Sequence, residues 1–516
     1  MKKIITMATF ALLATVGTQA QSVYDAAKFA NKDLTGSARF VGMGGAMGAL
    51  GGDISTMGVN PAGIGIYRSN DVMGTISYSM NETKSTYRSL STSADKNKVL
   101  FDNVGLVFAT PIGSQTSLRY VNFGFNYQRT KSFYKNMRME GLTDAIGISQ
   151  VNQMANQANN GLDSQGNGPD LGAAGAFDNP YVGWLSALGW QGYLLNEDAD
   201  GYYTDMLDSP YMLFESGERG GIDKFDFNIS FNFNERVYFG ITLGAYDVNY
   251  RKSTYHDEDY GNGEFYYLQG ENIIDGSGFD VKLGMIVRPF EYSPLRLGLA
   301  IHTPTFYKLT QSTAAYLYSE IYNSEDKLVA REIDTVRDLD GYYMPRDFKL
   351  QTPWLFNVSL GYTIGRNLAI GAEYEYEDYS TMKYKYPNGG GTMAETEEIK
   401  AHVKAVNTFR IGAEYKIVPE FALRVGYNYS STAFKDGAWK NLPYNAINVD
   451  TDYANTKGIS NYTFGFGYRG SSVYADLAYK YNNYKEDFYA FDNVDLDATN
   501  VKNNNHQLLF TLGMRF

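Results

Sequence analysis

Residues 36–68 read GSARFVGMGGAMGALGGDISTMGVNPAGIGIYR, and this stretch determines how the rest of the chain is interpreted. It is dense in glycine and small apolar residues, and it contains the motif Asn60-Pro61-Ala62-Gly63. Glycine at this density costs backbone entropy on folding, so the chain must gain something in return. Close packing in a confined space, where larger side chains would not fit, is such a gain. The stretch therefore predicts a compact plug enclosed by the rest of the chain.

The glycines of this run also suggest a dinucleotide-binding loop; they are Gly42, Gly44, Gly45, Gly48, Gly51 and Gly52. A dinucleotide loop requires the spacing GxGxxG after a strand and within a βαβ unit. The spacing here differs, no strand precedes the run, and no βαβ pattern surrounds it. Tight packing is therefore the favoured interpretation.

The composition favours a membrane β-barrel. The 516 residues include 44 Tyr, 30 Phe and 53 Gly but only 13 Pro, and mean hydropathy is −0.35. A barrel strand has one apolar and one polar face, so its average hydropathy stays near neutral. The net charge of −12 argues against a nucleic-acid partner. The absence of cysteine excludes disulfides and thiol catalysis.

From Asp71 onward apolar residues recur with a period of two. Phe225, Phe227, Ile229, Phe231 and Phe233, for example, alternate with polar residues. Such alternation is typical of strands with one apolar face. We predict fourteen strands of 11 to 15 residues, at 71–83, 100–112, 118–132, 222–234, 236–250, 278–290, 293–304, 351–364, 366–380, 405–417, 420–432, 460–470, 472–484 and 505–516. These exceed the usual soluble strand length and match a tilted membrane strand.

The connections between these strands alternate in length. Short ones fall around Ser114, Glu235, Tyr292, Gly365, Pro419 and Gly470, and long ones at 84–99, 133–221, 251–277, 305–350, 381–404, 433–459 and 485–504. Bacterial outer-membrane barrels have short periplasmic turns and long outer loops. The predicted fold is therefore a transmembrane antiparallel β-barrel of about fourteen strands in the bacterial outer membrane.

The N-terminus has the pattern of a secretory signal peptide over residues 1–20. Lys2 and Lys3 precede an uncharged apolar run, and small residues surround the expected cleavage after Ala20. We expect residues 21–70 to form the N-terminal hatch, and 71–516 to form the barrel with its outer loops.

The largest predicted loop, 133–221, contains a helical stretch near 142–157 and an apolar patch at 181–185. The patch is too apolar for a free loop. It either covers the mouth of the barrel or packs within the loop itself.

The chain ends in a strand whose alternate residues are apolar and whose last residue is Phe516. A terminal strand of this kind looks like the signal that barrel-assembly machinery recognises, so we expect that machinery as a partner. An ordinary edge strand is the alternative.

The hatch and barrel together resemble the FadL/TodX family of outer-membrane transporters. The resemblance is carried by the run Gly36–Gly52, by Asp53-Ile54-Ser55-Thr56, by Asn60-Pro61-Ala62-Gly63, and by strand segments such as Thr408–Tyr415 and Leu423–Tyr427. It covers essentially the whole chain after the signal peptide. It implies a fourteen-stranded barrel filled by an N-terminal hatch, and uptake of long-chain fatty acids or similar hydrophobic compounds. It also implies sideways release into the membrane lipid at a kinked strand.

The resemblance does not assign ligand contacts residue by residue, and the largest loop departs from the family by its place between the third and fourth strands. Glycine inside a strand can mark a bend, so Gly124 is our candidate for the kink. Arg296, Arg410 and Arg424 face the lumen by alternation and are candidates to hold a ligand carboxylate. The alternative is that inward charges pair with each other and with the hatch.

Two other classes of function remain open. A haemin receptor would need ligands on the outer loops, where Tyr255, His256 and Tyr260 form the nearest cluster. A secretion or surface-attachment barrel would bind no small molecule. The acidic run 492–497 could hold calcium, although a solvated loop is favoured because it lacks the glycine and terminal glutamate of an EF-hand. We expect no cofactor, no metal and no enzymatic activity, since no GxSxG motif occurs and His302 has no assignable catalytic partners.

Overall fold

The computed structural model describes residues 21–113, 115–143, 147–206 and 208–516. The predicted signal peptide, 1–20, lies outside the described residues. No helix in the described part of the chain is long and apolar enough to cross a membrane.

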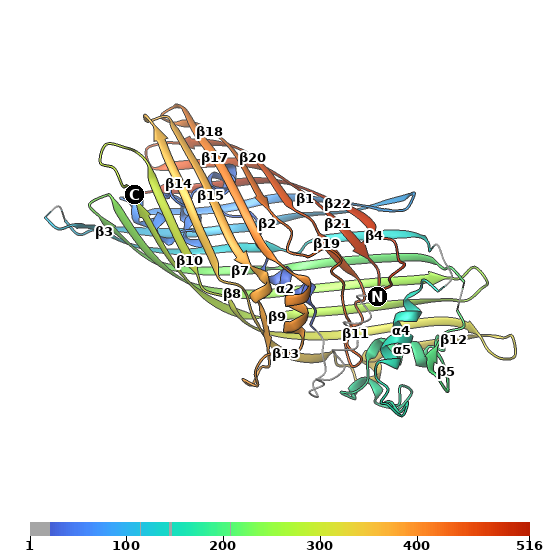
Figure 1. Ribbon diagram of the computed structural model, residues 1–516. Helices are drawn as coiled ribbons and strands as arrows, with labels where there is room; N and C mark the ends of the chain where they lie inside the picture. The colour runs from blue at the N-terminus through green and yellow to red at the C-terminus, as the bar shows by residue number, and fades with distance from the viewer. Residues whose placement is uncertain (1–20, 114, 144–146, 207) are drawn as a thin grey trace.

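Fourteen antiparallel strands form a closed barrel, which confirms the predicted fold class and strand number (Figure 1). Pairing of the first strand with the last closes the ring. The wall strands are β1 (Asp71–Tyr87), β2 (Leu90–Pro111), β3 (Leu118–Ser132), β7 (Tyr211–Phe233), β8 (Val237–Asp259), β9 (Phe265–Val287), β10 (Arg296–His302), β14 (Leu355–Ile364), β15 (Leu368–Asp378), β17 (Ala405–Val418), β18 (Phe421–Ser430), β20 (Ile459–Arg469), β21 (Val473–Tyr489) and β22 (Thr499–Arg515).

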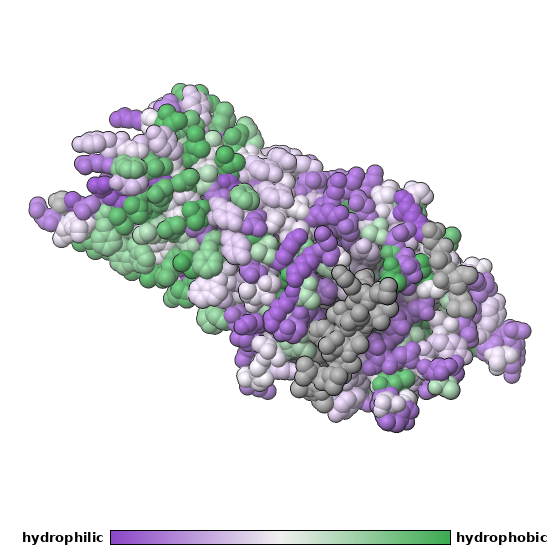
Figure 2. All heavy atoms as spheres, viewed as in Figure 1, coloured by the Kyte–Doolittle hydropathy of each residue, from purple (hydrophilic) through white to green (hydrophobic). Residues whose placement is uncertain are grey.

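The outer face of this wall is apolar. On β17, for example, Phe409 and Ile411 are each more than half exposed, while the intervening Arg410 faces the lumen. Figure 2 shows the resulting hydrophobic surface over the half of the molecule that carries β14 to β18, with hydrophilic residues at both ends. Exposed apolar side chains of this density are stable against lipid and not against water.

Several segments predicted as outer loops are strands. The hairpin of β8 and β9 extends to Asp259 and Phe265, and β7 begins at Tyr211. The predicted loop 305–350 contains β11 (Phe306–Tyr322), β12 (Leu328–Asp334) and β13 (Met344–Gln351). These extensions continue the barrel ladder beyond the apolar band (Figure 1). Outward residues of these extensions, such as Arg251, Ser253 and Asp257 of β8, are often polar, so the segments lack the apolar alternation on which the prediction rested.

Other outer elements are short: β4 (Lys135–Leu142), α4 (Gln150–Asn159), η3 (Ala176–Asp178), α5 (Trp184–Gln191), β5 (Asn196–Asp198), β6 (Gly201–Tyr203), α6 (Thr335–Asp338), η4 (Tyr379–Thr381), β16 (Lys383–Lys385), α7 (Glu395–His402) and β19 (Tyr453–Thr456). The helix predicted near 142–157 begins at Gln150, because Leu142 pairs with β7 as the end of β4. Trp184 and Leu185 are fully buried with Leu317 of β11 and Ile447. The apolar patch therefore packs against other loops and not only within its own.

The N-terminal segment, 21–70, is almost entirely buried and lies within the barrel (Figure 1). It consists of α2 (Val23–Ala30), α3 (Ala38–Gly42), η1 (Ile54–Gly58) and η2 (Pro61–Ile66). α3 packs against β20 and β21, and η2 packs against β7, β8 and β9. The glycine run serves this folding directly, since Gly44, Gly45, Gly51 and Gly52 have φ between +62° and +79°, where other residues are strained.

Candidate functional site

Glycines of the wall let the backbone of the N-terminal segment approach the strands directly. A Cβ on Gly412 would overlap the carbonyl oxygen of Met43, and one on Gly426 would overlap the backbone nitrogen of Gly44. A Cβ on Gly371 would likewise overlap the carbonyl oxygen of Ala46, and one on Gly240 would overlap the backbone of Pro61. The wall therefore forms glycine slots that match the glycine-rich segment.

The Asn60-Pro61-Ala62-Gly63 motif is fixed from both sides. The Asn60 side chain accepts a hydrogen bond from the Ala62 nitrogen at 3.2 Å and donates to the Met285 carbonyl oxygen at 3.3 Å. The Pro61 carbonyl oxygen accepts from Ser230 Oγ at 2.8 Å. The motif therefore joins the N-terminal segment to β7 and β9, and the structure gives it a packing role.

The three candidate arginines are already engaged. Arg410 pairs with Glu373 at 2.5 Å and with Glu375 at 3.1 Å. Arg424 pairs with Glu414 and Asp476, each at 2.7 Å, and the same Glu414 binds Arg39 of the N-terminal segment at 2.8 Å. Arg296 donates to the carbonyl oxygen of Leu50 at 2.6 Å. This geometry favours the alternative interpretation, in which inward charges pair with each other and with the hatch.

The histidines do not form the alternative sites. His302 binds the carbonyl oxygen of Val59 at 2.9 Å, so it is a hydrogen-bonding partner of the N-terminal segment. His256 is 2% exposed, with Nε2 3.0 Å from Glu258, and Tyr260 is also buried. Tyr255 points to the opposite face of β8. The cluster expected for haem ligation therefore does not converge on an open surface. The described residues contain no group of three or more His, Asp or Glu that could hold a metal ion.

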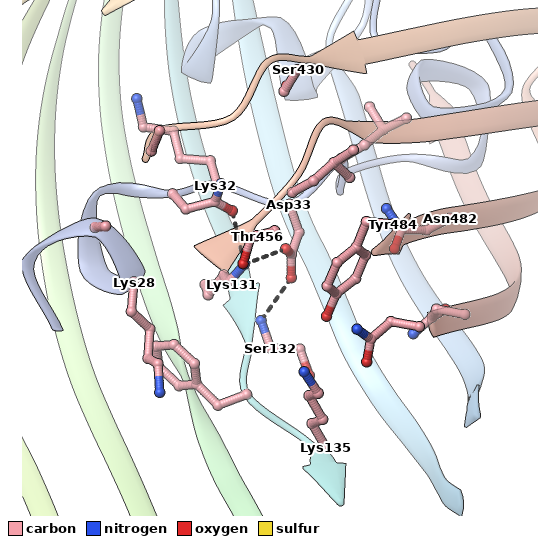
Figure 3. A pocket seen from close by; sticks show the side chains of 18 of the residues that line it. Lys28, Lys32, Asp33, Lys131, Ser132, Lys135, Ser430, Thr456, Asn482 and Tyr484 are labelled. Carbon is pink, nitrogen blue, oxygen red and sulfur yellow. Dashed lines mark hydrogen bonds and ion pairs between the residues drawn. The ribbon is translucent and has the colours of Figure 1, made fainter. Parts of the chain in front are cut away.

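A cavity of about 400 Å³ lies in the lumen above the N-terminal segment. Its lining comes from α2 and the residues after it, from the inner faces of β1, β3, β18, β21 and β22, and from the 433–459 loop. Figure 3 shows four lysines around this region: Lys28 on α2, Lys32 on the segment that follows it, Lys131 on β3 and Lys135 on β4. The volume falls within the range of about 300–1,000 Å³ usual for small-molecule sites.

The wall is interrupted beside this cavity. Pairing of β2 with β3 runs from Pro111–Tyr120 to Asn103–Gln128. Beyond that point β2 continues to Leu90 and, among the described residues, forms a ladder with β1 alone. On the other side, β3 and then β4 pair with β7. Leu100 and Asp102 on one side, and Gln128 to Lys135 on the other, line both this gap and the cavity.

Asp33, just after α2, holds β3 at the gap. Its nitrogen donates to the Thr130 carbonyl oxygen at 2.9 Å, and its carboxylate accepts from Lys131 Nζ at 2.8 Å and from the Ser132 nitrogen at 3.0 Å (Figure 3). The register of β3 against β7 shifts between Arg129 and Lys131. A bulge of this kind bends a strand. The N-terminal segment is therefore bonded to the strand where it leaves β2.

Gly124 lies elsewhere. It pairs in regular register with Val107 and Asn228, and a Cβ there would overlap the Met57 side chain. Its small size serves packing against η1. The bend of β3 is at residues 129–131, where the sequence has no glycine or proline to mark it.

A second interruption crosses the wall at Thr303-Pro304-Thr305, between β10 and β11, and at Thr352-Pro353-Trp354, between β13 and β14. Proline has no N–H to donate to the ladder. Here the threonines replace the lost bonds. The Thr305 nitrogen donates to Thr352 Oγ1 at 2.8 Å, the Thr352 nitrogen donates to the Thr305 carbonyl oxygen at 3.1 Å, and the Val281 nitrogen donates to Thr303 Oγ1 at 3.0 Å. This interruption is closed.

The chain aligns with the crystal structure of a Pseudomonas aeruginosa FadL homologue at a TM-score of 0.50 and 13% identity, over 94% of this chain and 99% of that one. It aligns with a deltaS2 mutant of the TodX monoaromatic hydrocarbon channel at 0.50 and 11% identity, over 94% and 100%. No family model and no curated protein match the sequence. The chain therefore has the FadL-type fold.

Proposed function

We propose that the protein is an outer-membrane channel for hydrophobic or amphipathic small molecules, among which long-chain fatty acids are the first class to test. The observation that carries this proposal is the end of β2–β3 pairing at Asn103–Gln128, which lies beside the lumenal cavity. The fold supports it, because TodX, with the same fold, is a monoaromatic hydrocarbon channel.

The proposed route has an outer entrance and a lateral exit. A solute enters between the outer loops and is held in the cavity above the N-terminal segment. That segment blocks the axial route, since it is fixed to the wall by glycine slots and ion pairs. The solute leaves between Asp102 and Gln128 into the bilayer. Removing its apolar surface from water there contributes about 25 cal/mol per Å².

The test is uptake of radiolabelled oleate by a Gram-negative host whose own fatty-acid channel has been deleted. Cells that express the protein should take up oleate several-fold faster than cells with an empty vector. They should also remain impermeable to a large hydrophilic antibiotic, because the N-terminal segment fills the lumen. Uptake no faster than in the empty-vector cells, with the barrel folded in the outer membrane, would refute the proposal.

A further inference from the structure

Uncharged amides form a chain across one side of the cavity. Asn482 Nδ2 on β21 donates to Asn461 Oδ1 on β20 at 2.9 Å, and Asn461 Nδ2 donates to Asn428 Oδ1 on β18 at 3.1 Å. All three residues line the cavity. Among the described residues, the side-chain Nδ2 of Asn428 and the side-chain Oδ1 of Asn482 make no hydrogen bond. The chain of amides therefore ends in one free donor and one free acceptor.

Most of the lysines that line the cavity are paired with carboxylates, whereas Lys440 and Lys480 donate to backbone carbonyl oxygens. Lys28 pairs with Glu218 and Lys32 with Glu377, each at 2.9 Å, and Lys135 pairs with Glu486 at 2.6 Å. A carboxylate ligand would have to displace a carboxylate of the protein at each of these lysines. A hydroxyl group has no such competition, since it can accept from the ammonium and donate to the carboxylate of the same pair.

Aromatic rings occupy the outer end of the cavity. The ring of Tyr24 in α2 is stacked on Phe434 with centroids 4.8 Å apart, and it lies 5.4 Å from Tyr453. All three residues line the cavity. Tyr453 is in turn stacked on Tyr489, so the rings form one apolar wall, against which the C–H groups of a pyranose ring can pack while its hydroxyls project at the rim.

We propose that the cavity binds a polyhydroxylated headgroup, namely the sugar of a glycosylated amphiphile, whose apolar tail leaves through the gap between β2 and β3. This inference rests on the proposed function and names its substrate class. Amides and hydroxyls each combine a donor with an acceptor, so the Asn428–Asn461–Asn482 chain and the lysine–carboxylate pairs complement adjacent hydroxyls. A bare hydrocarbon would leave these groups without the hydrogen bonds that water gives them, which is costly.

The test is calorimetric titration of the purified protein in a polyoxyethylene detergent, which contains no sugar. The ligands are octyl glucoside and decyl maltoside, compared with decanoate and butylbenzene, all below their micelle concentrations. We expect the glycosides to bind at least about tenfold more tightly than decanoate. Asn461→Leu and the milder Asn482→Ala should each weaken glycoside binding by about tenfold and leave decanoate unchanged.

Asn367→Ala, in a short turn at the other end of the barrel, is the matched control and should change neither affinity. Heat-dependent migration on gels checks that each variant is folded. Decanoate binding as tight as the glycosides, or glycoside binding unaffected by both variants, would overturn this inference. If decanoate is still taken up by cells, the proposed function survives that result; if no amphiphile binds or is taken up, both fail.

Discussion

The two interruptions of the barrel wall differ in what spans them. At Thr303–Thr305 and Thr352–Trp354 short threonine side chains and backbone atoms complete the ladder. Beyond the last β2–β3 pair, Phe101 of β2 stacks on Tyr127 of β3 with ring centroids 5.5 Å apart, and side chains of β1 and β2 contact Tyr134, which lies between β3 and β4. Lys98 Nζ lies 4.8 Å from the ring centre of Tyr134, and Asn81 Nδ2 donates to the Tyr134 carbonyl oxygen at 2.7 Å. A proline break alone therefore does not separate the strands of a barrel wall, whereas β2 and β3 separate where their ladder ends at Asn103–Gln128.

A gap in the wall matters for transport only if the N-terminal segment closes the axial route. The largest expected effect is therefore the rise in permeability when that segment is displaced from the lumen. Gly426→Val should displace it, because the added side chain would overlap the backbone of Gly44. We expect permeability to a large hydrophilic antibiotic to rise about tenfold or more, since overpacking a rigid contact costs typically 1–3 kcal/mol or more. Gly74→Ala is the matched control, because a Cβ there meets nothing within 4 Å. Equal permeability in both variants would show that the segment does not seal the lumen.

Removing a threonine tests whether the closed interruption depends on side chains. Thr352→Val deletes the hydroxyl that accepts a hydrogen bond from the Thr305 nitrogen. A buried donor left without a partner costs about 1–3 kcal/mol. The folded barrel should therefore unfold at lower denaturant concentration, and its conductance in planar bilayers should become noisier. Thr310→Val, on the outward face of β11, serves as the control. Unchanged stability of Thr352→Val would mean that backbone bonds alone close this part of the wall.

Asp33 tests whether the N-terminal segment holds β3 away from β2. Asp33→Ala removes the bonds to Lys131 and Ser132, so β3 should relax towards β2 and oleate uptake should fall several-fold. Asp33→Asn keeps one acceptor and should have an intermediate effect. Faster uptake in Asp33→Ala would show that Asp33 keeps the gap narrow.

The smallest expected effect depends on pH. α7 packs against α2 and η4. Burial raises the pKa of Glu395 to about 7, and burial likewise raises the pKa of Glu398 to about 7. Since the unfolded carboxyl titrates near 4.5, the folded state holds more protons between pH 4.5 and 7, and its stability falls as pH rises through that window.

Hydrogen exchange corrected for the intrinsic pH effect should therefore show α7 better protected at pH 5 than at pH 8. Glu395→Gln should reduce the difference. Equal corrected protection at both pH values would mean that these carboxyls are ionised in the folded protein.

Much of the fold follows from the sequence because alternation is a local property. The apolar positions of β17 and the terminal pairing of β22 with β1 both occur where alternation places them. The interruptions are different. Pro304 and Pro353 mark the closed one by their chemistry. The other lies where β2–β3 pairing ends, next to the register shift of β3 against β7 at Arg129–Lys131, and it therefore involves three strands.

The candidate site is harder to predict than the wall. Its residues come from elements distant in the sequence, such as Lys32, Asn482 and Phe434. The lumenal arginines were found by alternation, but alternation does not reveal that Glu373 and Glu375 already neutralise Arg410. Partner choice depends on tertiary structure, which a single-strand pattern does not contain. The role predicted for Phe516 in barrel assembly stays a prediction.

The central claim is that substrate leaves through the gap between β2 and β3. The chain has no cysteine, so Lys98→Cys with Tyr134→Cys can be joined selectively by a bifunctional methanethiosulfonate, with Thr310→Cys and Asp347→Cys, an exposed pair on the neighbouring strands β11 and β13, as the matched pair. We predict that cross-linking the first pair lowers oleate uptake about tenfold and that reductant restores it, while cross-linking the second pair has no effect. Full uptake with the first pair cross-linked would contradict the account.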